Sequence, residues 1–145
     1  MWFMDSHVTV LLSRATNEAG LSITEHAMPH GFGPPLHVHR AEDEVFYVLE
    51  GVIRYRWGDT IGEARQGDLV HMPRGVPHGF RVTAAEGARC LITSNGGFED
   101  MLRAGSRPAP SRSLPQAAVP TAAQQAELAA VCAAHGIDLL GPPID

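Results

Sequence analysis

The densest group of residues that could do chemistry is His37-Val38-His39, followed by Glu44 and, 34 residues after Glu44, by His78. Two histidines at alternate positions of a strand place their side chains on one face, about 6.6 Å apart. A metal ion about 2.1 Å from each imidazole nitrogen can bridge that gap. The spacing therefore predicts that His37 and His39 bind one metal ion.

Glu44 and His78 complete the predicted ligand set. Glu44 lies five residues after His39, and this odd number would point its side chain to the opposite face of a straight strand. The polar residues 40–43 predict a turn or bulge that brings Glu44 back towards the same cavity. His78 follows a turn and would supply the fourth ligand from another strand. The competing interpretation is that His37 and His39 only form a polar strand face.

The donor types restrict the kind of metal. Three neutral imidazoles and one carboxylate suit one divalent iron, manganese, nickel, cobalt or copper ion per chain, with two open positions in an octahedral site. The absence of a thiolate argues against a structural zinc site, although a non-structural zinc ion stays in the set.

Composition excludes several classes of protein. The chain has 145 residues, 44% of them hydrophobic, which fits one folded domain. A net charge of −5 argues against binding to nucleic acid or to an anionic membrane. All basic residues are Arg, so chemistry that needs a lysine is excluded. Two cysteines, no signal-peptide pattern and no long apolar run predict a cytoplasmic protein outside the membrane.

Hydrophobic alternation and turn residues predict a barrel or sandwich of short strands. The expected strands are 8–12, 21–27, 45–49, 53–57, 69–72, 80–83 and 90–93. A short helix is expected over 97–105, then a proline-rich linker, and then a helix from the N-cap Thr121 to His135. We therefore expect a β-barrel domain over 1–98 and a helical tail over 99–145 that packs on the barrel or on a partner chain.

Two longer motifs contain the predicted ligands. The first runs from Gly31 through His37, His39 and Glu44 to Gly51. The second contains Gly67, Pro73, Gly75 and His78. Both resemble the two conserved motifs of the cupin superfamily, and nearly the whole chain is similar to small single-domain bacterial cupins of the quercetin dioxygenase-like group. One position differs, since Val82 stands where the second motif usually has Asn.

The resemblance implies an all-β cupin jelly-roll barrel, or double-stranded β-helix, with a short C-terminal helical extension. It also implies a metal ion inside the barrel on His37, His39, Glu44 and His78, and a homodimer. The Asn replaced by Val82 is not a metal ligand in the family, so the metal site is expected to be intact while one polar contact is missing. The apolar stripe of the C-terminal helix, Leu128, Val131 and Cys132, needs cover and also favours a homodimer.

The expected function is that of a metal-dependent dioxygenase or other oxidoreductase acting on a small aromatic, polyketide-like or flavonol-like molecule. Glu44 would be both a metal ligand and the general base. Two alternatives stay open: a non-redox isomerase, cyclase or epimerase, and a ligand-binding barrel without turnover.

Strand periodicity predicts which other residues line the cavity. Phe46 and Val48 share the phase of Glu44, and Phe80 and Val82 share the phase of His78, so all four are expected to contact the substrate. The alternative is that they are only barrel core. Among the other histidines, His71 is expected at the surface or an interface, and His7, His26, His30 and His135 are expected to be structural or exposed. Glu42 and Asp43 are expected in a solvated turn, with an approach to the cavity mouth as the alternative.

Overall fold

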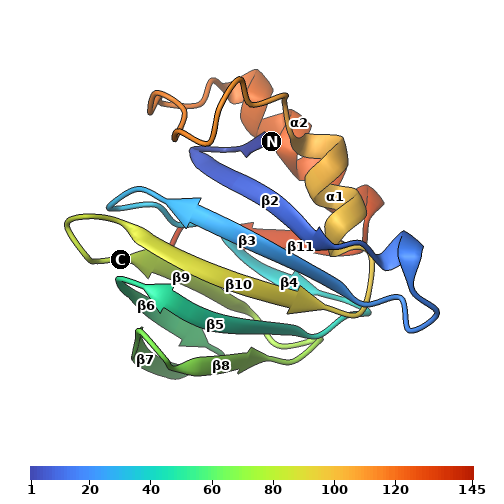
Figure 1. Cartoon of the computed structure of the whole chain (residues 1–145), viewed down its shortest axis with the longest axis horizontal. Coiled ribbons are helices and arrows are strands. Elements are labelled where there is room, and N and C mark those ends of the chain that lie inside the picture. The colour runs from blue at the N-terminus through green and yellow to red at the C-terminus, as the bar shows by residue number, and fades with distance from the viewer.

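The computed structural model describes residues 1–145 and contains two antiparallel sheets that face each other (Figure 1). The first sheet has the spatial order β1 (Trp2–Phe3), β2 (Ser6–Leu12), β3 (Ser22–Met28), β10 (Ala88–Ser94), β5 (Glu44–Glu50) and β8 (Leu69–Met72). The second has the order β11 (Ile137–Gly141), β4 (Leu36–His39), β9 (His78–Val82), β6 (Val52–Trp57) and β7 (Thr60–Arg65). This is the predicted jelly-roll barrel.

Alternating burial along the strands creates the interior. In β3 and β10 every second residue is buried, as expected for strands with one face inside and one outside. The inward residues of both sheets form a single core that includes Phe46, Val48, Ile53, Val82 and Ile92. The metal-ligand candidates lie within this interior, between the two sheets.

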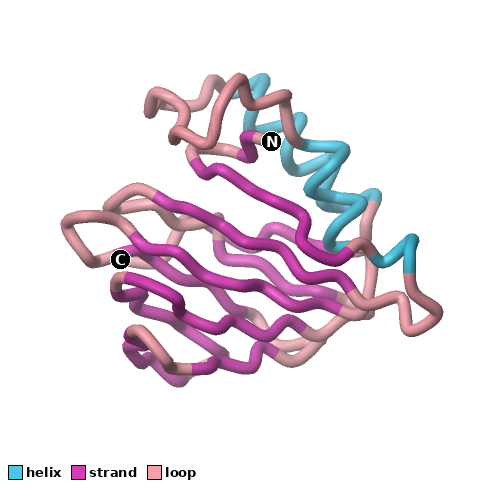
Figure 2. The backbone as a smooth tube through the Cα atoms, in the orientation of Figure 1, coloured by secondary structure: helices cyan, strands magenta, loops and turns pink.

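Three helical segments accompany the barrel: the 3-10 turn η1 (Arg14–Thr16), α1 (Phe98–Gly105) and α2 (Ala122–Ala134). Figure 2 shows α1 and α2 together at one side of the molecule, beside β2. Thr121 caps α2 as predicted, because its hydroxyl accepts from the Gln124 N–H while the Gln124 side chain accepts from the Thr121 N–H. None of these helices is long and apolar enough to cross a membrane.

The C-terminal tail contains a strand in addition to the expected helices. After α2, the chain forms strand β11, which pairs antiparallel with β4, the strand of His37 and His39, and so forms the edge of that sheet. Gly136, with φ of +80°, makes the left-handed turn between α2 and β11. The stripe of α2 is covered within the chain, since Cys132 is buried and Leu128 and Val131 pack on the core.

Candidate metal centre

The four predicted ligands come from three strands in two sheets. His37 and His39 lie on β4, His78 lies on β9, and His37 and His78 are direct partners across the two strands. Glu44 opens β5 in the opposite sheet. Residues 40–43 carry the chain from one sheet to the other, so the odd spacing between His39 and Glu44 still leaves both side chains facing the interior.

The structure brings these four residues together in a buried cluster. One ligand atom of each, an imidazole nitrogen or a carboxylate oxygen, lies within 4.8 Å of those of the other three. The ring centroids of His37 and His78 are 4.5 Å apart, and those of His39 and His78 are 5.3 Å apart. All four side chains are buried. A cluster of this size and composition is suited to one metal ion.

Backbone carbonyls orient two of the imidazoles. Nδ1 of His37 donates to the carbonyl oxygen of Pro35 at 2.8 Å, and Nδ1 of His78 donates to that of Val76 at 3.0 Å. A neutral imidazole that carries its proton on Nδ1 has a free lone pair on Nε2. Both rings are therefore held in the tautomer that a metal ion requires, with Nε2 as the ligand atom.

Glu42 performs the same task for His39, and the expectation that it lies in a solvated turn is wrong. The Glu42 side chain is almost completely buried, and its Oε1 accepts from Nδ1 of His39 at 2.8 Å. Its Oε2 accepts from the backbone N–H of Phe98 at 2.8 Å and from the Ser94 hydroxyl at 3.1 Å. These partners lie more than 50 residues away, so the local polarity of 40–43 gave no signal for them.

Burial and neighbouring charges set the protonation of the cluster. Burial lowers the pKa of His37 to about 4, so this imidazole is neutral at pH 7. Burial by itself raises the pKa of Glu44, but His39 and His78 outweigh burial and lower that pKa to about 2. Burial also opposes charge on His39, yet the carboxylates of Glu44 and Glu42 hold its pKa above the ordinary value. Glu44 is therefore ionised and the cluster is able to hold a cation.

Unsatisfied polar atoms support the fit of a metal ion. Nε2 of His39 and Oε1 of Glu44 are fully buried and have no hydrogen-bond partner. Leaving a buried polar atom unpaired costs about 1–3 kcal/mol, more when the group is charged. Both atoms belong to the candidate ligand set, and a divalent cation bound to His37, His39, Glu44 and His78 would satisfy both.

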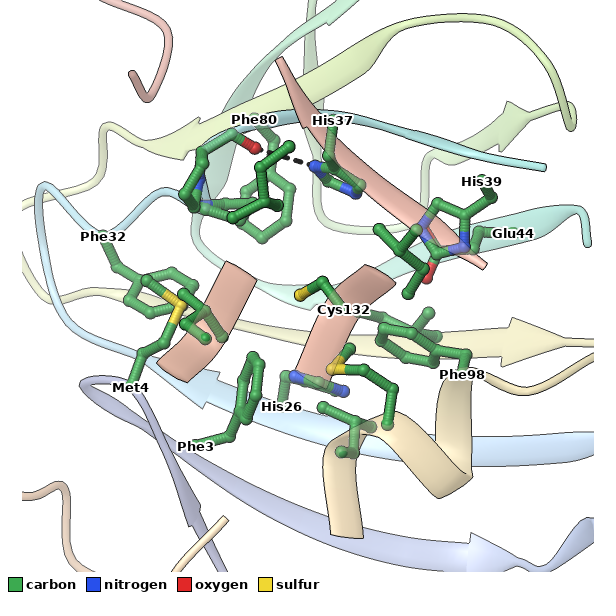
Figure 3. A pocket seen from close by; sticks show the side chains of 18 of the residues that line it. Phe3, Met4, His26, Phe32, His37, His39, Glu44, Phe80, Phe98 and Cys132 are labelled. Carbon is green, nitrogen blue, oxygen red and sulfur yellow. Dashed lines mark hydrogen bonds and ion pairs between the residues drawn. The ribbon is translucent and has the colours of Figure 1, made fainter. Parts of the chain in front are cut away.

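A largely apolar cavity adjoins the cluster (Figure 3). Phe46 and Phe80 line it, as predicted, and their rings meet edge to face with centroids 5.2 Å apart. Val48 and Val82 are buried but do not line it, so the cavity gives no support to their assignment as substrate contacts. Each valine lies two residues further along its strand, beyond the paired aromatic rings, and is packed in the core.

Several cavity residues were not predicted to be there. The tail contributes Leu128, Cys132 and Ile137, so residues beyond the barrel domain help to enclose the site. His26, on β3, was expected to be structural or solvent-facing, but it is buried and lines the cavity. The alternation in this strand gave the opposite signal, because it would place the apolar Ile23 inside, whereas the structure buries Thr24 and His26. His71 is on the surface, as expected, close to Asp43.

The comparisons with known proteins agree with this geometry. Residues 24–94 match the family model described as "Cupin domain", and this segment contains all four cluster residues. The "Oxidoreductase iacF" of Pestalotiopsis fici is 39% identical over 49 residues, which are 33% of this chain and 24% of that protein. The chain thus matches only about a quarter of the length of this relative.

Solved structures share the fold. A predicted oxalate decarboxylase from Thermotoga maritima superposes with a TM-score of 0.59 at 21% identity, over 62% of this chain and 79% of that one. The cupin domain of Schizosaccharomyces pombe Cnp3 superposes with a TM-score of 0.57 at 19% identity, over 74% and 76% of the two chains. The cupin family model thus covers residues 24–94, and the solved structures share the jelly-roll fold.

Proposed function

We propose that the protein is a metal-dependent oxidoreductase of the dioxygenase type, acting on a small aromatic or otherwise apolar molecule that carries a hydroxyl or enol group. The observation that carries the proposal is the buried His37, His39, Glu44 and His78 cluster at the wall of an apolar cavity. A complete ligand set favours an enzyme over an empty binding barrel. The name of the relative from Pestalotiopsis fici supports redox chemistry over isomerisation.

The cavity wall explains the preference for an apolar substrate. Of the residues that line it, thirteen are hydrophobic, including Phe32, Phe46, Phe80 and Phe98. Aromatic side chains bind flat apolar molecules well and exclude water, which strengthens electrostatic interactions at the cluster. A divalent ion held by the four ligands would act as a Lewis acid that lowers the pKa of a substrate hydroxyl or enol.

Glu44 is the residue placed to take the proton of that hydroxyl. Its Oε2 lies 3.3 Å from both Nε2 of His39 and Nε2 of His78, whereas its Oε1 has no partner in the chain. The Glu44 carboxylate is ionised at pH 7, because its pKa is lowered to about 2. We infer that the Glu44 carboxylate accepts the substrate proton and returns it to the product, while dioxygen serves as the oxidant.

Oxygen uptake tests the proposal. The protein is loaded separately with Fe²⁺, Mn²⁺, Ni²⁺, Co²⁺ and Cu²⁺ and offered a series of phenols and enols, from catechol to quercetin. We expect oxygen consumption that follows substrate loss and that disappears in His78→Ala at one metal ion per chain, because this variant lacks one ligand. Conversion of a member of the series without oxygen uptake would overturn the redox assignment in favour of an isomerase or cyclase.

A further inference from the structure

His26 is the one polar side chain that lines the cavity outside the metal-ligand cluster. The other lining residues are hydrophobic side chains, the prolines Pro34 and Pro35, and three of the four cluster residues, His37, His39 and Glu44. The His26 ring stacks on Phe98 with centroids 6.1 Å apart, and the His39 ring lies 5.9 Å from the same Phe98. Figure 3 shows His26 and His37 on opposite sides of the cavity. A small ligand bound at the cluster can therefore reach His26.

A chain of hydrogen bonds determines which nitrogen of His26 carries the proton. The Thr24 hydroxyl donates to the carbonyl oxygen of Ile92 at 3.3 Å, because a carbonyl oxygen can only accept. The hydroxyl has one hydrogen, so while it donates to Ile92 it accepts in its 3.0 Å contact with Nε2 of His26. The proton of the neutral ring is then on Nε2, and Nδ1 has a free lone pair.

Nδ1 of His26 is available to a ligand. No group of the chain forms a hydrogen bond with it. It is also not one of the fully buried polar atoms without a partner, so part of its surface is accessible. The His26 side chain retains about 4% exposure and lines the cavity, so Nδ1 opens into that space. The ring stays neutral at pH 7, because burial lowers its pKa to about 4.

We propose that Nδ1 of His26 accepts a hydrogen bond from the substrate and so selects small aromatic molecules that carry a donor, a phenolic hydroxyl or an N–H, at the end away from the metal ligands. This inference rests on the proposed function, because it assumes that the apolar cavity is the substrate site. It makes His26 a specificity residue, whereas the cluster residues bind the reacting end.

The tautomer can be tested without any ligand. Long-range ¹H–¹⁵N correlation spectra of the imidazole groups distinguish a protonated ring nitrogen from one with a lone pair. In the metal-free protein we expect the His26 signals, assigned by their loss in His26→Phe, to show the proton on Nε2. A proton on Nδ1 at pH 7 would overturn the inference.

Matched ligands test the selectivity. Phenol and toluene have similar shapes, but only phenol donates a hydrogen bond, and their dissociation constants are measured by ligand-observed NMR on metal-free protein. A single hydrogen bond contributes about 0.5–1.5 kcal/mol, or roughly 2- to 12-fold in affinity. We expect the preference for phenol over toluene to fall by this factor in His26→Phe, and to be unchanged in the control His71→Phe, which alters an exposed histidine.

Thr24→Val supplies a second variant that keeps the His26 ring. Without the Thr24 hydroxyl, the ring is free to place its proton on Nδ1, and the preference should move from phenol towards the acceptor benzaldehyde. An unchanged phenol preference in both folded variants would overturn the inference. Because no turnover is measured, a protein that selects phenol through His26 but consumes no oxygen would refute the proposed function and leave this inference standing.

Discussion

Nδ1 of His39 lies 2.8 Å from Oε1 of Glu42, and both side chains are almost completely shielded from water. The carboxylate is held in turn by the backbone N–H of Phe98, the first residue of α1. The start of the C-terminal segment is thus connected through Glu42 to a candidate metal ligand. Carboxylates in this position fix the orientation of a ligating imidazole and raise its basicity.

Glu42→Gln should weaken metal binding without removing a ligand. Both Glu42 oxygens accept hydrogen bonds, and the amide group of Gln would face at least one donor with its own N–H. We expect a loss of about 10- to 100-fold in metal affinity, measured by competition with a chelator. Glu50→Gln, at the exposed end of the next strand, is the control and should bind metal like the wild type. Equal affinity in both variants would contradict the role of Glu42.

Substitutions at His37 and Glu44 should have different consequences. His37→Ala removes a ligand, so its oxygen uptake should recover when the metal ion is added in excess. Glu44→Gln keeps the size of the side chain but cannot take a proton, and its rate should stay lower by about 100-fold or more at saturating metal. Full activity of metal-saturated Glu44→Gln would refute the proton transfer while leaving the metal site intact.

The stability of the metal-free protein should fall in mild acid because of His26. In the unfolded chain this imidazole takes up a proton near pH 6.5, but in the folded protein burial lowers its pKa to about 4. Between these values the unfolded state binds more protons, so the free energy of unfolding decreases as the pH falls. The contribution is about 2 kcal/mol between pH 7 and pH 5.

Urea unfolding of wild type and His26→Phe at several pH values isolates this effect. The two proteins are compared by the slope of the free energy of unfolding against pH. A destabilisation by the substitution that is the same at every pH does not change this slope. We expect the slope between pH 7 and pH 5 to be smaller in His26→Phe. Parallel curves for the two proteins would show that His26 is not buried in the neutral form.

The sequence was informative wherever a local pattern determined the structure. Strand 69–72 was predicted at its observed bounds, and the alternation in 45–49 correctly placed Phe46 inside. The convergence of Glu44 on the histidines was predicted, although residues 40–43 achieve it by bending across to the other sheet. These features depend on residue order over a few positions, which periodicity reports directly.

Features that depend on distant partners were not predictable in the same way. Glu42 looks like a turn residue until Ser94 and Phe98 are brought to it by the fold. Strand β11 is short and lies in a glycine- and proline-containing tail, and only its pairing with β4 makes it a strand. Val48 and Val82 have the correct phase, but phase does not say how far along the strand a cavity extends.

The homodimer stays a prediction, and one exposed apolar row on the sheet offers a surface for it. Tyr47 and Leu69 are opposite each other on β5 and β8, and both are exposed on the outer face of the six-stranded sheet. Leu91 lies beside Tyr47 on β10 and extends this apolar row. We propose that a second copy of the chain covers the row, because the α2 stripe is already covered within the chain.

Light scattering after size-exclusion chromatography tests this interface. The wild type should have the mass of a dimer at micromolar concentration, and Leu69→Glu should have that of a monomer. Ile61→Glu alters an equally exposed residue on β7 in the other sheet and should stay dimeric. A monomeric wild type, or a dimeric Leu69→Glu, would refute the proposed interface.

The central claim is that His37, His39, Glu44 and His78 bind one divalent metal ion inside the barrel. Elemental analysis of freshly purified protein, repeated after chelation and reloading, measures this most directly. The account predicts close to one ion per wild-type chain after reloading and a large loss in His78→Ala, while His71→Ala keeps the full content. A folded wild-type protein that takes up no divalent metal, or a His78→Ala variant that binds as much as the wild type, would contradict it.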